Sequence, residues 1–331
     1  MTGGAARRVA EARTVAQMLA GPPGKSAADV VARLGALQAQ DLSATALAVR
    51  ARTRGRTADE LGLEGPGFVR TWLLRGTLHL VAADDAGWML ALLGPLNRTR
   101  GARRRQQLGL DDELCGRAVE TLPEALADGP VGRADLIARL ASLGVTIDPT
   151  GQAPAHLLAY AASTGTICLG PEIGRGKASY RLLNAPAPNF SREEALTRLA
   201  SRYLAGHRPA TPADFAAWSG LPARDAKAAF EGASPPPDAE PANSIRLVGH
   251  FDPYLLGYAD KTAAVPPKFV DRVRTGGGFV TPTVLVDGVA VATWRQHGST
   301  IAVDPFEPLP NDVQSAVAAE IADIHRFQRR P

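Results

Sequence analysis

Cysteine is scarce in this chain, and the scarcity excludes two kinds of small stabilised protein. The 331 residues hold two cysteines, Cys115 in a helical segment and Cys168 in a strand-like segment. Two such thiols build neither a disulfide framework nor a thiolate metal cage. We therefore expect both cysteines to be buried and structural, as free cysteines usually are.

Long apolar runs are also missing. No run approaches the roughly 20 residues that a membrane span needs, and residues 1–8 lack the apolar stretch of a signal peptide. With 45% hydrophobic residues in a chain of 331, there is enough material for two or more cores. These features predict a soluble, multidomain, cytoplasmic protein.

Recognisable metal-ligand and phosphate-binding patterns are absent as well. The six histidines show neither the His-x-x-x-His spacing nor the carboxylate spacing of a metal site. The glycine run at 276–278 is a turn signal and is too short for a nucleotide-binding fingerprint. We expect no metal and no cofactor.

Acidic residues are sparse in the first third of the chain. Residues 1–110 contain 16 Arg and Lys against 8 Asp and Glu, whereas the remainder contains 21 against 25. A locally positive surface attracts phosphates through counterion release, independently of sequence. A high-GC preference for arginine, with the charges on solvated helix faces, explains the same composition and stays open.

Three segments repeat one arrangement, in which short helices and a turn lead to another helix and then to an apolar hairpin or strand. The predicted helices are 27–37 and 43–54 in the first copy, 111–126, 133–143 and 152–163 in the second, and 192–207, 212–219 and 223–231 in the third. The predicted hairpins are 68–74 with 77–81 and 167–170 with 178–183. A helix–turn–helix followed by a hairpin is the winged-helix arrangement, commonly a DNA-docking device.

The composition changes after residue 233. A proline-rich tract at 234–241 is typical of a stiff linker. Beyond it, apolar runs at 244–248, 279–286, 289–293 and 299–303 predict a small β-barrel or sandwich. Apolar positions at helical spacing predict a final helix at 311–329.

Gln38 and Gln40 stand where one helical pattern pauses and the next begins. Asp41 or Ser43 is a suitable N-cap for the second helix. Side chains two apart on a straight helix point to nearly opposite faces, whereas an extended or turn backbone sends both the same way. We therefore predict a non-helical backbone between Leu37 and Ser43 and two amides that converge on one small site. Ordinary exposure at a helix junction is the alternative, because glutamine is mostly a surface residue.

Four motifs, spread in order along nearly the whole chain, resemble one known family. They are Leu37-Gln-Ala-Gln-Asp41, Arg70-Thr-Trp-Leu-Leu-Arg-Gly-Thr-Leu-His79, His250-Phe-Asp-Pro-Tyr-Leu-Leu-Gly-Tyr258 and Val286-Asp-Gly-Val-Ala-Val-Ala-Thr-Trp-Arg295. The family is that of the AlkZ/YcaQ-like winged-helix DNA glycosylases, bacterial base-excision enzymes for alkylated DNA. The resemblance implies a mainly α with β (α+β) fold. It would have three tandem winged-helix domains, here 1–110, 111–187 and 188–233, and a small C-terminal β-barrel with a final helix at 242–331.

The resemblance also places the catalytic Gln-x-Gln element of the AlkZ-like branch on Gln38 and Gln40. One departure is visible. The family usually has Trp-Pro-Met-Arg-Gly-Thr where this chain has Trp72-Leu-Leu-Arg-Gly-Thr77. Loss of the proline should alter the stiffness of that strand, which affects substrate fit more than chemistry.

Two neutral amides suffice for one class of lesion. Alkylation at guanine N7 or adenine N3 leaves the base cationic, so its N-glycosidic bond is weak and the base departs as a neutral molecule. What remains is to hold a water below C1′ and to stabilise an oxocarbenium-like sugar, which are tasks for oriented amide dipoles. Because glutamine is a poor base, we expect positioning and electrostatics, with selectivity for cationic lesions over uncharged damage such as uracil.

Other residues are candidates for contact with DNA or for lining the cleft. Alternation along the first hairpin places Arg75, Thr77 and His79 on one strand face. Phosphate contact suits the basic residues Arg98, Arg100, Arg103, Arg104 and Arg105. DNA contact suits Arg175 and Lys177 between the glycines of the second hairpin. By the resemblance, Trp72, Asp252, Tyr254 and Tyr258 border the cleft. Internal hydrogen bonding, solvated helix faces and core packing stay open as the respective alternatives.

The leading hypothesis is a monofunctional DNA glycosylase that hydrolyses the N-glycosidic bond of cationic alkylated purines in base excision repair. Bulky N7-guanine adducts or interstrand crosslinks are natural candidates in this branch. The partner is double-stranded DNA with alkylated bases, and we expect a nucleoid-associated monomer without an obligate protein partner. The alternative is a non-enzymatic winged-helix transcriptional regulator, although its recognition helices would need base-contacting side chains and these helices are rich in Ala and Leu.

Overall fold

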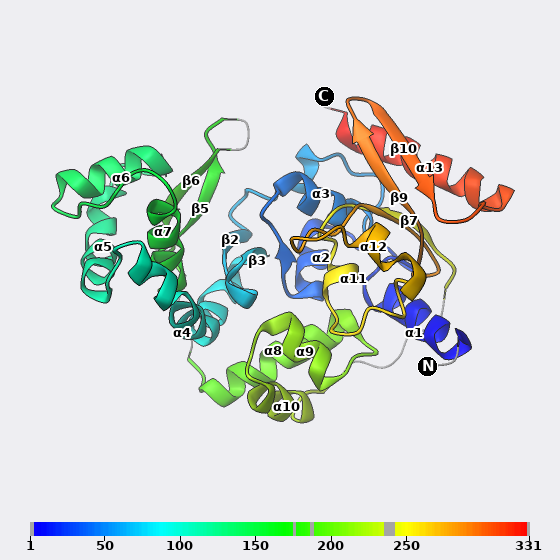
Figure 1. Ribbon diagram of the computed structural model, residues 1–331, viewed down its shortest axis with the longest axis horizontal. Helices are drawn as coiled ribbons and strands as arrows, with labels where there is room; N and C mark the ends of the chain where they lie inside the picture. Colours follow the sequence, from blue (N-terminus) through cyan, green and yellow to red (C-terminus); the bar gives the residue numbers. More distant parts are fainter. Residues whose placement is uncertain (1–2, 175–176, 186–188, 235–241, 330–331) are drawn as a thin grey trace. The chain divides into compact units, whose positions relative to one another are not determined.

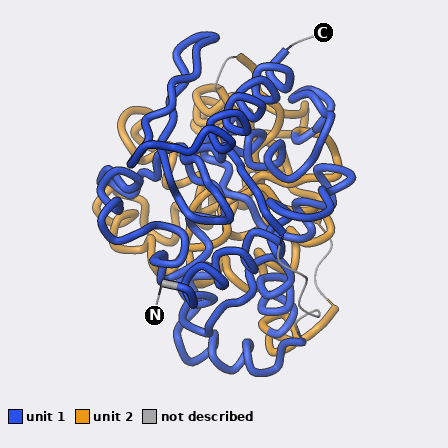
Figure 2. The backbone as a smooth tube through the Cα atoms, turned by 90° about the vertical axis from the view of Figure 1, so that its right-hand side faces the viewer, with its two compact units in different colours: residues 1–63, 197–331 blue, residues 64–196 orange. Residues whose placement is uncertain are grey.

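The computed structural model describes residues 3–174, 177–185, 189–234 and 242–329. Contacts divide the chain into two compact units (Figure 2): a terminal unit of residues 1–63 and 197–331, and a central unit of residues 64–196. The predicted linker at 234–241 lies outside the described residues except for Ser234. Within the described ranges no helix is long and apolar enough to cross a membrane.

The central unit packs helices against an antiparallel sheet whose strand order is β3-β2-β5-β6-β4 (Figure 1). Its strands are β2 (Phe68–Trp72), β3 (Leu78–Ala82), β4 (Val131–Gly132), β5 (Ile167–Glu172) and β6 (Ala178–Leu182). Its helices are the 3₁₀ turn η2 (Leu74–Gly76), α4 (Ala83–Gln107), α5 (Asp112–Ala125), α6 (Arg133–Ser142) and α7 (Ala153–Ser163). The core between them is built mainly from leucine and alanine, with the free cysteine Cys115 buried within it.

Local signals explain where these helices begin and how closely they pack. Helix α5 starts at Asp111, whose carboxylate accepts a 2.7 Å hydrogen bond from the Leu114 amide. Helix α4 approaches α7 at Gly94, where a β-carbon would lie 2.1 Å from the Ser163 carbonyl oxygen. Only glycine permits this approach. Cys168 is free and buried like Cys115, so the structural prediction for both cysteines is confirmed.

The terminal unit combines helices from both ends of the chain with a second antiparallel sheet. Its helices are α1 (Gly3–Ala16), α2 (Ala27–Leu34), α3 (Leu42–Arg50), η1 (Asp59–Leu61), α8 (Arg192–His207, from residue 197), α9 (Pro212–Ser219), α10 (Ala223–Glu231), α11 (Pro253–Leu256), η3 (Pro267–Phe269), α12 (Val270–Val273) and α13 (Asn311–Gln328). Its strands are the short β1 (Leu37–Gln38), then β7 (Ile245–Val248), β8 (Thr283–Val286), β9 (Val289–His297) and β10 (Thr300–Pro305). The last four form a meander in the order β10-β9-β8-β7, and α13 packs against β7 and α3.

Most predicted helices and strands are present, and the mixed α and β architecture agrees with the α+β expectation. Thr211 caps α9 in a capping box with Asp214, and Pro212 occupies the first turn, as the sequence indicates. The helix predicted at 43–54 is shorter and ends at Arg50. Over the described residues the four strands after 242 follow one another in linear order. Closure into a barrel and the division into three winged-helix domains stay predictions.

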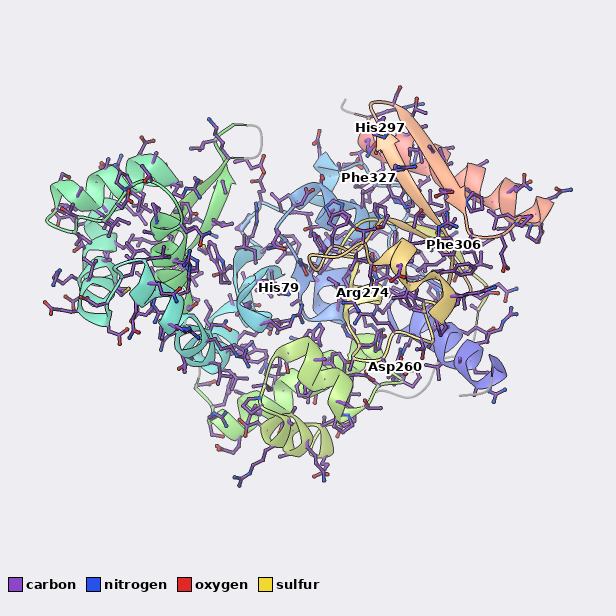
Figure 3. The ribbon with its side chains drawn as sticks, viewed as in Figure 1. His79, Asp260, Arg274, His297, Phe306 and Phe327 are labelled. Carbon is purple, nitrogen blue, oxygen red and sulfur yellow. The ribbon has the colours of Figure 1, made fainter. Side chains whose placement is uncertain are left out.

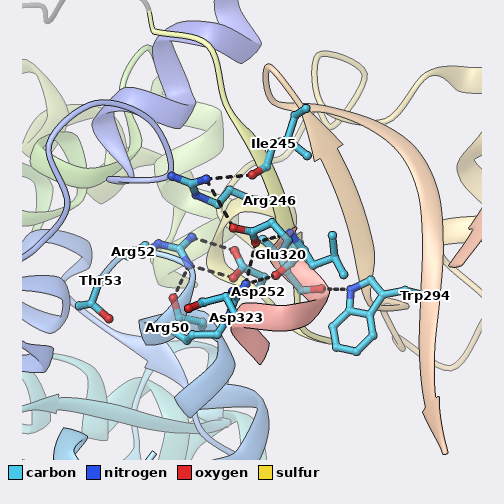
Figure 4. A network of polar contacts seen from close by, with 12 residues as sticks. Arg50, Arg52, Thr53, Ile245, Arg246, Asp252, Trp294, Glu320 and Asp323 are labelled. Atoms are coloured by element: carbon cyan, nitrogen blue, oxygen red, sulfur yellow. Dashed lines mark hydrogen bonds and ion pairs between the residues drawn. The ribbon is translucent and has the colours of Figure 1, made fainter. Parts of the chain in front are cut away.

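Two buried arginines near the end of α3 fix this helix inside the terminal unit (Figure 4). Arg50 donates to Asp323 on α13 at 2.8 Å and to the Leu247 carbonyl of β7 at 2.7 Å. Arg52 makes a bidentate ion pair with Asp252, with N–O distances of 2.8 and 2.9 Å, and both side chains are fully buried. Breaking such a buried pair costs about 3–5 kcal/mol. The segment that precedes α3 is therefore attached to a firmly anchored helix.

Candidate active site

Gln38 and Gln40 lie in a non-helical segment between α2 and α3, as predicted. Helix α2 ends at Leu34 because Gly35 adopts a positive φ of 75° and donates its amide to the Val31 carbonyl. The chain is then extended at Leu37–Gln38, and Asp41 caps α3 through the Ser43 and Ala44 amides. A straight helix through the glutamines is thus excluded.

The two amide side chains converge. Gln38 Nε2 donates to Gln40 Oε1 at 2.7 Å. Ala39 between them is completely buried, whereas Gln38 is half-buried and Gln40 exposed, which is the alternation of extended backbone. Among the described residues no further side-chain hydrogen bond is made by either amide. The side-chain oxygen Oε1 of Gln38 and the side-chain amino group Nε2 of Gln40 are therefore available to a water or a substrate.

A buried hydroxyl closes the glutamine segment into a fixed loop. Thr45 lies on the first turns of α3 and is 1% exposed. Its hydroxyl lies 3.0 Å from the backbone carbonyl oxygens of both Gln38 and Asp41 and shares its one hydrogen between them. One side chain thus ties both ends of the segment to α3. The orientation of the amides follows from the backbone rather than from their own contacts alone.

A carboxylate and an imidazole stand directly beside the pair. Asp41 Oδ1 accepts from the Ser43 amide at 2.8 Å and from the Ser43 hydroxyl at 2.7 Å, and Oδ2 lies 3.1 Å from His250 Nε2. The hydrogen bond from His250, followed by those from Ser43, holds the pKa of the Asp41 carboxyl well below its usual range. Asp41 therefore carries a negative charge next to Gln40. Both residues occur in the sequence motifs, but nothing in a single sequence indicates that they meet.

A second candidate site, an arginine pocket in the central unit, gathers several of the predicted DNA-contacting residues. It has a volume of about 460 Å³ and no acidic residue in its lining. Its main polar and aromatic residues are Trp72, Arg75, Arg98, Arg100, Arg104, Arg105, His156 and Tyr160. His156 was not predicted as a site residue, and Arg103 is exposed but lies outside the pocket. The pocket is a concave, positively charged surface suited to an anion.

Arg98 and Arg104 of the pocket are held by neutral acceptors, whereas Arg105 contacts an aromatic ring and lies 3.7 Å from the Asp112 carboxylate. Arg98 donates to the Ser163 carbonyl at 2.7 Å, and Arg104 donates to the Gln152 side chain at 2.9 Å. Arg105 is buried, donates to the Arg98 carbonyl and lies over the Tyr160 ring at 4.6 Å. Arg105 is thus largely a structural residue of the pocket, whereas Arg100 and Arg104 are exposed.

The first hairpin does not present the predicted face. Arg75 lies in the tight turn η2 with φ of 56°, Thr77 follows that turn, and only His79 is on a strand. His79 is 2% exposed, and its Nδ1 contacts the Thr77 carbonyl at 2.9 Å. Burial, followed by the charge of Arg75, lowers the pKa of His79 to about 3. The shared strand face was therefore a wrong prediction, because the chain tightens before β3 and buries a neutral imidazole.

Hydrogen bonds close this turn at Leu73, the position where the family pattern has a proline. The Leu73 amide donates to the Thr77 carbonyl at 3.0 Å, and the Leu73 carbonyl accepts from Asn97 at 2.6 Å. A proline at this position has no amide hydrogen to donate. Leu73 and Leu74 are both fully buried. Replacing the proline of the family pattern by Leu73 therefore loses the stiffness of the proline ring, gains a backbone hydrogen bond and leaves the turn closed.

The remaining predicted residues fall outside both sites. Arg175 lies outside the described residues, and Lys177 is exposed at the tip of the β5–β6 hairpin. Asp252, Tyr254 and Tyr258 are at most 1% exposed. Asp252 pairs with Arg52, and the Tyr254 hydroxyl donates to the Gly288 carbonyl at 2.9 Å. These three residues pack the terminal unit internally and line no open surface.

No group of three or more His, Cys, Asp or Glu side chains within the described ranges is arranged to hold a metal ion.

The protein combines a mixed α and β fold with a loop in which two glutamine side chains are paired. Comparison with known proteins shows to which family this combination belongs. The family model described as DNA glycosylase AlkZ-like matches residues 31–236 and 231–327. The chain therefore belongs to the AlkZ-like family of DNA glycosylases, and the family resemblance drawn from the motifs is confirmed.

A sequence match and a structure match, both to Streptomyces sahachiroi, extend this finding. The chain is 28% identical over 356 positions to the interstrand DNA cross-link repair glycosylase of Streptomyces sahachiroi, with 92% of each chain covered. The solved structure of Streptomyces sahachiroi DNA glycosylase AlkZ matches with a TM-score of 0.81 and 25% sequence identity, over 98% of each chain. Both matches carry the name of the enzyme class that the motifs indicated.

Proposed function

We propose that this chain hydrolyses the N-glycosidic bond of cationic alkylated purines in double-stranded DNA. Gln38 and Gln40 would orient the attacking water. The observation that carries the proposal is the 2.7 Å hydrogen bond between the two side chains. It directs both amides to one place beside an ionised carboxylate.

Gln38, Gln40 and Asp41 each have a separate role in the proposed reaction. The side-chain oxygen Oε1 of Gln38 accepts a hydrogen bond from the water. The side-chain amino group of Gln40 donates to the same water or to the sugar. Asp41 supplies negative charge near the oxocarbenium-like sugar. Its oxygens are already occupied by Ser43 and His250, so it acts through its field rather than as a base. A base that is already cationic leaves without an acid catalyst, and for this reason the site needs none.

The central unit would contribute contacts to the DNA backbone. Arg100 and Arg104 are exposed residues of a pocket without carboxylates, and such residues neutralise phosphates without reading sequence. Lys177 at the tip of the β5–β6 hairpin is a further candidate, as is Arg175, which lies outside the described residues. Arg75 and Trp72 line the same pocket, with Trp72 offering a ring on which an unstacked base can lie.

The finer architecture and setting belong to the same proposal. Hairpins β2–β3 and β5–β6 each follow helices, which supports winged-helix domains at 1–110 and 111–187, with a third at 188–233 and a β-barrel domain at 242–331. A DNA substrate places the protein at the nucleoid, and we propose that it acts as a monomer. The comparisons do not favour the transcriptional regulator.

Release of free base tests the proposal. The protein should liberate 7-methylguanine from a methylated duplex and leave an abasic site that hot alkali cleaves. A uracil-containing duplex of the same sequence is the control and should stay intact. Absence of base release from any cationic lesion would refute the proposal, whereas equal activity on uracil would refute the role given to the cationic leaving group.

A further inference from the structure

An apolar pocket in the terminal unit begins at the residues that hold Asp41. Its volume is about 830 Å³, within the range of sites that enclose a drug-sized group. Ser43 and His250, which both hydrogen bond Asp41, are part of its lining. The pocket therefore adjoins the glutamine loop through two direct contacts within the same unit.

One wall of the pocket is an exposed aromatic cluster. The His250 ring stacks on Phe279, with ring centroids 5.7 Å apart and an interplanar angle of 22°. Phe251 meets both rings edge-on at 5.3 Å. Phe279 is 41% exposed, although it is a large apolar residue. A face that folding alone would bury is thus kept open to solvent.

The backbone that presents this wall is held in an unfavourable conformation. Phe251 adopts a φ of 57°, a left-handed conformation that is strained for a residue with a β-carbon. Its neighbour His250 is thereby placed between Asp41 and Phe279. Strain retained at such a junction is typical of ligand-binding positions rather than of ordinary turns.

Several polar side chains around the pocket are already paired, although the exposed Arg295 of its lining is not among them. Arg272 forms a 2.7 Å ion pair with Asp304, and the Gln296 and Gln328 amides bond each other at 2.8 and 3.0 Å. His297 at the end of β9 and Phe327 on α13 lie together at this part of the unit (Figure 3). Because Arg272 and Asp304 neutralise each other and most of the lining is apolar, the pocket favours a flat apolar group over a phosphate.

We infer that this pocket receives an aromatic substituent carried by the damaged base, which would stack on Phe279 and His250. The inference rests on the proposed function and deepens it, because it names the part of the protein that would distinguish a bulky adduct from a methyl group. A methyl lesion is too small to reach the pocket, so only bulky adducts would gain from it. A planar ring on such a wall gains stacking energy beyond that of the area that it buries.

The experiment compares two lesions in one duplex: 7-methylguanine and an aryl-mustard monoadduct at guanine N7. The Phe279→Ala variant should lower kcat/KM about tenfold for the aryl adduct and leave excision of 7-methylguanine within twofold. Thr275→Trp, which fills the pocket from an exposed loop position, should produce the same selective loss. Leu143→Ala, a change of another exposed large apolar residue in the central unit, is the matched control and should affect neither lesion.

Equal losses on both lesions, or no loss on either, would overturn the inference. Affinity for a duplex with a non-hydrolysable aryl adduct separates this result from failure of the proposed function. A wild-type protein that releases no base, yet binds the aryl adduct tenfold more tightly than Phe279→Ala does, would refute the glycosylase proposal and support the pocket. Equal affinity of wild type and variant would overturn the pocket whatever the outcome for catalysis.

Discussion

The terminal unit and the arginine pocket of the central unit use arginine in different ways. In the terminal unit, Arg50, Arg52 and Arg272 are each paired with carboxylates. In the central pocket, Arg98 and Arg104 donate to a carbonyl and to a neutral amide. Pairing with a carboxylate cancels the charge and fixes the fold, whereas a neutral acceptor fixes the side chain and leaves its charge for a ligand. Partners, and not the number of arginines, determine which surface can bind an anion.

The largest expected effect is on stability in the terminal unit. Asp252→Ala leaves Arg52 buried without its carboxylate and should lower the free energy of unfolding by about 3–5 kcal/mol, as measured by urea denaturation. Asp304→Ala removes the partner of Arg272 from a half-exposed pair and should cost less than about 1 kcal/mol. Similar losses in the two variants would show that buried and exposed pairing do not differ here.

The second effect concerns the hairpin beside the arginine pocket. Leu73→Pro removes the amide that bonds Thr77 and demands a φ near −65° where the residue has −128°. The free energy of unfolding should fall by about 2–3 kcal/mol. Leu74 is the other position that differs from the family pattern. Leu74→Met keeps the side-chain volume there and should cost less than about 1.5 kcal/mol. A neutral Leu73→Pro would mean that the hydrogen bond does not hold the turn.

Each unit also contains a buried histidine that should make it sensitive to acid. Burial is the leading cause that lowers the pKa of His79 and of His207 to about 3. Because the unfolded chain binds these protons near pH 6.5 and the folded chain does not, stability is full above that pH and falls below it. From pH 7 to pH 5 the loss should be about 2 kcal/mol for each histidine.

Phenylalanine variants check this dependence. His207→Phe and His79→Phe should each remove their own share of the decline in stability between pH 7 and pH 5. An unchanged slope in either variant would show that the imidazole becomes protonated within the folded protein.

The smallest expected effect is on DNA affinity. Arg100→Ala and Arg104→Ala should each weaken binding to undamaged duplex several-fold. Each should also reduce the slope of log K against log salt by about 1. Arg117→Ala removes an arginine that already pairs with Glu113 and serves as the control without a change in slope. Equal slopes for all three variants would contradict the role proposed for the arginine pocket in phosphate contact.

Local features of the fold follow from the sequence because their causes lie within a few residues. Thr211 and Pro212 start a helix, Asp41 caps another, and alternating apolar residues mark the strands before and after Gly288. The non-helical backbone at Gln38 and Gln40 was predictable on the same basis, since it depends only on where two neighbouring helices end and begin.

The surroundings of the candidate site were not predictable, because they depend on contacts between distant residues. His250 and Asp41 are 209 positions apart in the sequence, and Arg52 and Asp252 are 200 apart. The positive φ of Arg75 breaks a strand alternation that its sequence suggests. Asp252, Tyr254 and Tyr258 share a motif with His250, yet packing buries all three and leaves His250 beside the loop.

The rate of base release by glutamine variants tests the central claim most directly. Under single-turnover conditions with 7-methylguanine DNA, Gln38→Ala and Gln40→Ala should each slow release about 10²–10³-fold, with DNA affinity within twofold of wild type. The double variant should be no slower than the slower single variant, because the two amides act as one unit. Gln314→Ala, at an exposed glutamine on α13, should keep the wild-type rate. Full activity in either single variant, or losses that multiply in the double variant, would contradict a shared water site.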